Sequence, residues 1–180
     1  MHWLYYQRLP DSDKHDDPEL VKQFNKSGVD TPRQSQVVRL YVFGDKYDVA
    51  ELRRSAIDCL FKTVMRPGGK IPSFNVVDHA FANLLEDSPM CRLLVDMYFN
   101  YEDLEIDRGQ CKNTAFMRAM WERWVRFHCT REKKRGIGLK LCDYHDHTTE
   151  EERMVCEKMR EACEKAEEAC KAARSTQSRE

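Results

Sequence analysis

The stretch from Val37 to Val64 constrains the fold more than any other part of the chain. It reads VVRLYVFGDKYDVAELRRSAIDCLFKTV, with apolar residues at helical spacing on both sides of a polar corner. The first segment is apolar on most of its circumference, so we expect a buried helix. In the second segment Leu52, Ala56 and Leu60 share one face. The stretch therefore predicts two adjoining helices joined by a tight turn.

Asp48 and Glu51 predict where the second of these helices begins. The Asp48 carboxylate can accept a hydrogen bond from a backbone N–H of the first turn, which has no partner inside the helix. Glu51 can reach back to the Asp48 amide and complete a capping box. We therefore expect Asp48 to be the N-cap of this helix.

Three further segments each carry an apolar stripe at helical spacing. They begin after Ser73, at the cap-and-proline pair Ser88-Pro89, and at Asn113. The last one has a heavy aromatic face, which we interpret as core, with a partner-binding groove as the alternative. That face comprises Phe116, Met117, Met120, Trp121, Trp124, Val125 and Phe127. The predicted fold class is all-α, an irregular antiparallel helical bundle.

A long final helix is predicted from the capping boxes that Thr148 and Thr149 form with Glu151 and Glu152, ending near Arg174. Its apolar seam has heptad spacing but consists largely of alanine, so a coiled coil with a partner helix would bury little area. The seam residues are Val155, Met159, Ala162, Ala166, Ala169 and Ala173. Cys156, Cys163 and Cys170 recur every seven residues beside it and are interpreted as small helix-compatible residues.

These signals divide the chain into five parts. They are an aromatic segment (1–10), a linker with one short helix (11–35), the helical bundle (36–130), a basic and histidine-containing loop (131–147), and the C-terminal helix with a disordered end (148–180).

Composition narrows the classes of partner and compartment. The formal net charge of −1 provides no global field for nucleic acid or an anionic membrane, and no apolar run approaches 18 residues. We therefore expect neither nucleic acid nor membrane as a partner. The eight cysteines are spread along the chain without a secretory leader, which predicts reduced thiols and a cytoplasmic or nuclear location.

The segment LYVFGDKYDVAELRRSAIDCLF resembles the late helical hairpin of BTB/POZ domains, especially the type common in fungi. Residues 2–6 (HWLYY) are similar to the segment that precedes this hairpin in the family. Residues 88–96 and 142–147 are similar to stretches further downstream in the fungal proteins. The resemblance thus extends loosely over most of the chain.

The resemblance implies a non-catalytic protein-interaction module, an adaptor or scaffold that self-associates or docks a cullin-type ligase scaffold. The strand-rich N-terminal half of the domain, which supplies most dimer contacts, would precede Trp3. We therefore expect a truncated domain, as a fragment, a wrongly assigned start or a diverged remnant, and dimerisation and cullin docking are open to test. The candidate protein-binding residues are Trp3, Tyr5, Tyr6, Tyr47 and Asp48.

Cys129, Cys142, His145 and His147 have the ligand chemistry of a zinc site, with His128 as a fifth candidate. Their spacing differs from the common zinc frameworks, so a capping loop with a buried thiol is the preferred interpretation and no metal or cofactor is expected. Two alternatives remain: a small zinc-binding structural or regulatory protein, or a helical coiled-coil scaffold whose final helix pairs with a partner. No GxSxG, HExxH or GxGxxG string is present, and we expect no enzymatic activity.

Overall fold

The structure, a computed structural model, describes residues 9–10, 16–25, 32–66, 68–100, 111–129, 139–147, 149–159 and 161–162. Within these ranges the regular structure is entirely helical, and no strand occurs. The all-α fold class predicted from the apolar periodicity is therefore confirmed. None of the described helices is both long enough and apolar enough to cross a membrane.

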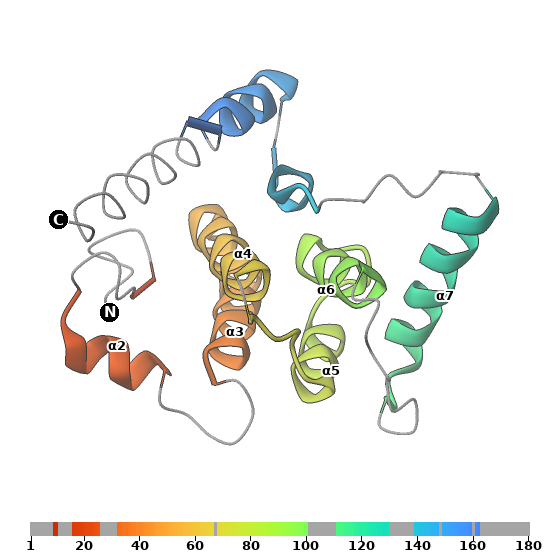
Figure 1. Cartoon of the computed structure of the whole chain (residues 1–180), viewed down its shortest axis with the longest axis horizontal. Helices are drawn as coiled ribbons and strands as arrows, with labels where there is room; N and C mark the ends of the chain where they lie inside the picture. Colours follow the sequence, from red (N-terminus) through yellow and green to blue (C-terminus); the bar gives the residue numbers. More distant parts are fainter. Residues whose placement is uncertain are drawn as a thin grey trace, which may run out of the picture. The chain divides into compact units, whose positions relative to one another are not determined.

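The chain forms two compact units, Met1–His145 and Asp146–Glu180. The first unit contains the labelled helices of Figure 1, and the second contains helical residues 150–159. The helices of the first unit are α2 (Pro18–Asn25), α3 (Pro32–Lys46), α4 (Ala50–Met65), α5 (Phe74–Asn83), α6 (Pro89–Asn100), α7 (Thr114–Cys129) and the short 3-10 helix η2 (Leu141–Tyr144).

Helices α3 and α4 form the expected hairpin and lie side by side in Figure 1. The turn between them ends α3 in a Schellman arrangement, in which the Val49 N–H donates to the Gly44 carbonyl at 2.7 Å. Asp48 supplies the left-handed residue of this turn, with φ of 52°. Its backbone therefore terminates α3 instead of beginning α4.

The prediction that Asp48 caps α4 is wrong. The N-cap is Val49, and α4 has no side-chain cap hydrogen bond. The left-handed backbone of Asp48 carries its carboxylate to one side, where it accepts a hydrogen bond from Arg53 Nη1 at 3.1 Å. Sequence spacing alone did not show whether Asp48 ends α3 or begins α4.

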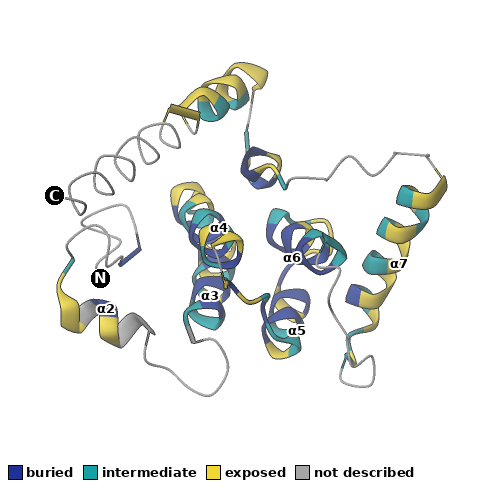
Figure 2. Ribbon diagram, in the orientation of Figure 1, coloured by how far each residue is buried: buried dark blue, intermediate teal, exposed yellow. Residues whose placement is uncertain are grey.

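The core of the first unit lies among α3, α4, α5 and α6, where Figure 2 shows buried residues gathered on the inner faces. Val37, Val38 and Tyr41 of α3 are at most 1% exposed. The expectation that α3 is buried on most sides is wrong at Phe43, which is 52% exposed and contacts the Tyr47 ring at 4.5 Å between centroids. From α4 and α5 the core takes Leu52, Ala56, Ile57, Cys59, Leu60, Val64, Val76, Val77, Ala80 and Phe81.

Helix α6 is the most deeply buried element. Pro89 occupies its first position, and the Cys91 N–H donates to Ser88 Oγ at 3.3 Å, which confirms the predicted cap. Met90, Leu93, Leu94 and other side chains of α6 fill the centre of the core. Leu85 lies two residues beyond the end of α5 at Asn83 and is 77% exposed.

Candidate functional site

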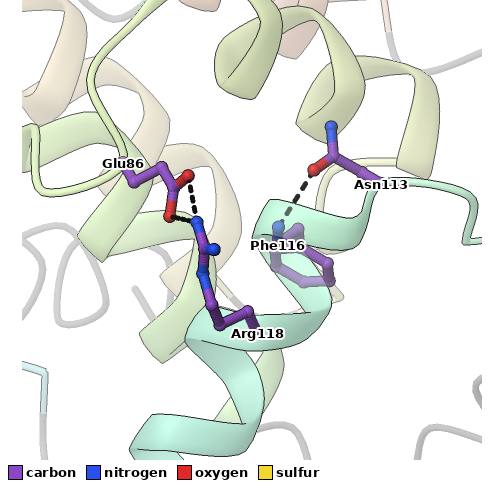
Figure 3. Close-up of polar contacts among 4 residues, drawn as sticks. All are labelled: Glu86, Asn113, Phe116 and Arg118. Atoms are coloured by element: carbon purple, nitrogen blue, oxygen red, sulfur yellow. Dashed lines mark hydrogen bonds and ion pairs between the residues drawn. The ribbon is translucent and has the colours of Figure 1, made fainter.

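Helix α7 begins at Thr114 because the Asn113 side chain supplies a hydrogen-bond acceptor to a backbone N–H of the first turn. Asn113 Oδ1 accepts a hydrogen bond from the Phe116 N–H at 2.9 Å, which confirms the helix start predicted from the sequence. One turn further on, Arg118 forms an ion pair with both carboxylate oxygens of Glu86, in the connection between α5 and α6 (Figure 3). The two contacts fix the N-terminal end of α7.

Phe116 anchors this end in the core. In α7, all of which the structure describes, Phe116 alone is buried, at 2% exposed. Its ring lies 5.2 Å from Tyr98, 5.6 Å from Phe81 and 6.4 Å from Phe74 between centroids, each in an edge-on arrangement. Such pairs are among the favourable geometries for aromatic rings. The opposite end of α7 contacts α6 through Phe127, 5.4 Å from Phe99.

The other side of α7 carries large side chains that nothing in the described structure covers. Met117 is 43% exposed, Trp121 63% and Trp124 46%. The two indole rings stack with centroids 5.2 Å apart and planes 17° apart, and Trp124 contacts the His128 ring at 4.2 Å. We call these four residues the α7 aromatic face.

The prediction that the whole aromatic stripe of α7 is core is therefore wrong. The stripe covers about half of the helix circumference at 100° per residue, and contact with α6 and α5 buries only part of it. Apolar periodicity gave no means of separating the residues that face α6 from those that face away.

Asp96 of α6 joins α7 to η2. Its carboxylate accepts a hydrogen bond from Arg123 Nε at 2.6 Å and another from the Tyr144 hydroxyl at 2.8 Å. Burial, with a further contribution from the Asp96 charge, raises the pKa of Tyr144 well above its usual range. The Tyr144 hydroxyl therefore stays protonated and donates its hydrogen bond to Asp96, and this network links α6, α7 and η2.

Two of the candidate zinc ligands, Cys142 and His145, lie in η2 and directly after it. Cys142 is 2% exposed, and His145 Nε2 lies 2.8 Å from Asp58 Oδ1 of α4.

The other zinc candidates lie elsewhere. Cys129 is exposed at the end of α7. His147 belongs to the second unit. Of the three cysteines with seven-residue spacing, Cys156 is partly exposed, and Cys163 and Cys170 lie outside the described part of the chain.

The protein-binding residues predicted from the resemblance fall into two sets. Trp3, Tyr5 and Tyr6 lie outside the described residues. Tyr47 is 59% exposed at the α3–α4 corner, beside Asp48, which is paired with Arg53. Tyr47 and Asp48 therefore both lie on the surface. Their part in protein binding stays a prediction.

Comparisons of the chain with protein families, with curated proteins and with solved structures found no match. Function is therefore inferred from the chain's own geometry.

Proposed function

We propose that this chain is a non-catalytic protein-interaction module, similar to the C-terminal helices of the fungal type of BTB/POZ domain, and that the α7 aromatic face is its docking surface. The observation that carries the proposal is the exposed, stacked pair Trp121 and Trp124. Tryptophan is enriched among the residues that dominate binding energy at protein interfaces. Contiguous exposed apolar surface of this kind marks interaction sites.

The occupant we assign to this face is a second copy of the chain. Met117, Trp121, Trp124 and His128 are separated by steps of four, three and four residues, the spacing of a helix-pairing seam. The seam is about 17 Å long at 1.5 Å per residue, a little over three turns. Two such seams can meet antiparallel about a two-fold axis, so that each tryptophan pair packs against the other.

The area involved predicts a weak association. A fully exposed tryptophan offers on the order of 200 Å², so the exposed fractions of Trp121, Trp124 and Met117 give about 300 Å² per copy. The total of roughly 600 Å² lies below the ~1,200 Å² of stable specific interfaces. A reversible dimer with a dissociation constant in the micromolar to millimolar range is the expected result.

A cytoplasmic or nuclear location is part of the proposal. The eight cysteines are spread along the chain without the dense pattern of a secreted disulfide scaffold.

Sedimentation equilibrium over a wide range of protein concentration tests the proposal. The expected result is a monomer at low micromolar concentration and a growing dimer fraction above it, lost when Trp121 and Trp124 are both replaced by alanine. Leu85→Ala is the matched control, because Leu85 is 77% exposed but lies outside α7. A monomer at every concentration, or a dimer that the double variant retains, would refute the assignment. Saturable binding to a cullin N-terminal domain in place of a dimer would give the face a different occupant.

A further inference from the structure

We propose that the surface formed by α4 and α6 is a recognition site for a short peptide of the pattern Leu-x-x-Tyr-His, and that residues 139–145 are the copy of this peptide that the chain itself supplies. These residues include η2 (Leu141–Tyr144), which packs against both helices. They are the last residues of the first unit, which ends at His145. The site is separate from the α7 aromatic face, and the proposal does not depend on it.

The segment contacts this surface with one side only. Leu141, Cys142 and Tyr144 are buried, whereas Lys140 and Asp143 are exposed. Residues three apart lie on the same side of a 3-10 helix, so Leu141 and Tyr144 enter the apolar core together. A helix of four residues is too short to be stable alone in water. Packing against α4 and α6 is therefore what holds η2 in its helical form.

Each of the two helices contributes one carboxylate to the recognition. The Tyr144 hydroxyl donates a hydrogen bond to Asp96 Oδ2 of α6 at 2.8 Å. His145 Nε2 lies 2.8 Å from Asp58 Oδ1 of α4, and the His145 side chain is 4% exposed. Hydrogen bonds to a charged acceptor are stronger than those between neutral groups. Two adjacent residues of the segment are thus bound by two different helices, which makes the surface selective for the Tyr-His pair.

The surface keeps its polar contacts when the segment is released. Asp96 Oδ1 also accepts a hydrogen bond from Arg123 Nε at 2.6 Å. Asp58 is 38% exposed, so water replaces His145 there. Release therefore leaves neither carboxylate buried without a partner, which is the costly outcome for a charged group. The apolar side chains under the segment would meet water, so an occupant of the same chemistry is favoured over an empty surface.

The test measures binding of a fluorescein-labelled peptide of residues 139–145 (LKLCDYH) to the full chain by anisotropy, under reducing conditions. The double variant Tyr144→Ala/His145→Ala removes both polar contacts of the chain's own segment and so frees the surface. We expect saturable binding to this variant and binding at least about 10-fold weaker to the wild type, in which the tethered segment competes. A peptide with the change Tyr144→Phe should bind about 10- to 100-fold more weakly, because it offers Asp96 no hydroxyl donor.

Two further variants make the test specific. Asp143→Ala is the matched control: Asp143 belongs to η2 but is exposed, so this variant should bind the peptide as weakly as the wild type does. Asp58→Ala, added to the double variant, should weaken peptide binding, because Asp58 faces the peptide histidine. The proposal is overturned if the peptide binds neither the wild type nor the double variant, if it binds both equally, or if Asp58→Ala or the phenylalanine peptide has no effect. Loss of the helical circular dichroism in the double variant would also overturn it, because residues 139–145 would then be part of the core and not its ligand.

Discussion

Replacing Phe116 by alanine tests whether α7 is held to the first unit by its buried end. Phe116 is 2% exposed and contacts the rings of Phe74, Phe81 and Tyr98. The substitution removes a buried ring and leaves a cavity among side chains that can collapse only in part. Changes of this type reduce the free energy of unfolding by about 3–5 kcal/mol. For a chain of this size that corresponds to a fall in melting temperature of about 6–20 °C.

Trp121→Ala provides the comparison on the same helix. Trp121 is larger than Phe116 but is 63% exposed, and its ring contact is with Trp124, itself 46% exposed. Its loss should change the free energy of unfolding by less than about 1 kcal/mol, as expected for a surface position. Side-chain size and exposure thus predict opposite rankings of the two variants.

The assay is urea denaturation monitored by circular dichroism at a protein concentration low enough to keep the chain monomeric. The midpoint for Phe116→Ala should fall well below that of Trp121→Ala, with similar denaturant slopes. If Trp121→Ala is destabilised as much as Phe116→Ala, the orientation of α7 described above is wrong. The same conclusion follows if Phe116→Ala loses less than about 1 kcal/mol.

Four other changes have expected outcomes that the same denaturation assay measures. Asn113→Ala removes the cap of α7 and should reduce stability by about 1 kcal/mol, and no loss would show that the cap contributes nothing. Gly69→Ala should reduce the free energy of unfolding by about 2 kcal/mol or more, because its Cβ would lie 2.2 Å from the Val64 carbonyl oxygen. Gly68→Ala should reduce it by only about 1 kcal/mol, because its Cβ meets open space and only the φ of +73° is unfavourable. Equal losses in the two variants would contradict this geometry. Asp48→Gly should be neutral or stabilising by up to about 1 kcal/mol, since glycine adopts the left-handed turn readily and the carboxylate that is lost is 93% exposed. Clear destabilisation would mean that the contact with Arg53, which is 14% exposed, contributes more than the backbone. Burial raises the pKa of the Cys91 thiol to about 11, so the folded state keeps a proton that the unfolded state loses above about pH 9. The free energy of unfolding should therefore fall by about 2–3 kcal/mol as the pH rises from 9 through 11. The fall should be smaller in Cys91→Ala, and a fall of unchanged size in that variant would exclude the thiol as the cause.

The α3–α4 hairpin could be predicted from the sequence because its signals are local. Apolar residues at helical spacing on both sides of a polar corner define two helices whatever surrounds them. The starts of α6 and α7 were predictable for the same reason, since Ser88 and Asn113 each accept a hydrogen bond from the backbone N–H three residues further on. Each of these features depends on a few neighbouring residues.

Features that depend on three-dimensional packing were not predictable in this way. The aromatic stripe of α7 is continuous in the sequence, and only the positions of α5 and α6 decide that Phe116 is buried while Trp121 is exposed. The contact between His145 and Asp58 joins residues 87 positions apart, and no periodicity could indicate it.

The connection between α4 and α5 contains glycines and basic residues, yet its backbone is bound from two sides. The Lys70 carbonyl accepts a hydrogen bond from Gln34 Nε2 at 2.5 Å, and the Pro72 carbonyl accepts one from the buried Tyr98 hydroxyl. Proteases cleave segments that can leave the surface and extend through an active site. Trypsin should therefore not cut the Lys70–Ile71 bond in the native protein. Cleavage there would show that the hydrogen bonds of this connection with Gln34 and Tyr98 had broken.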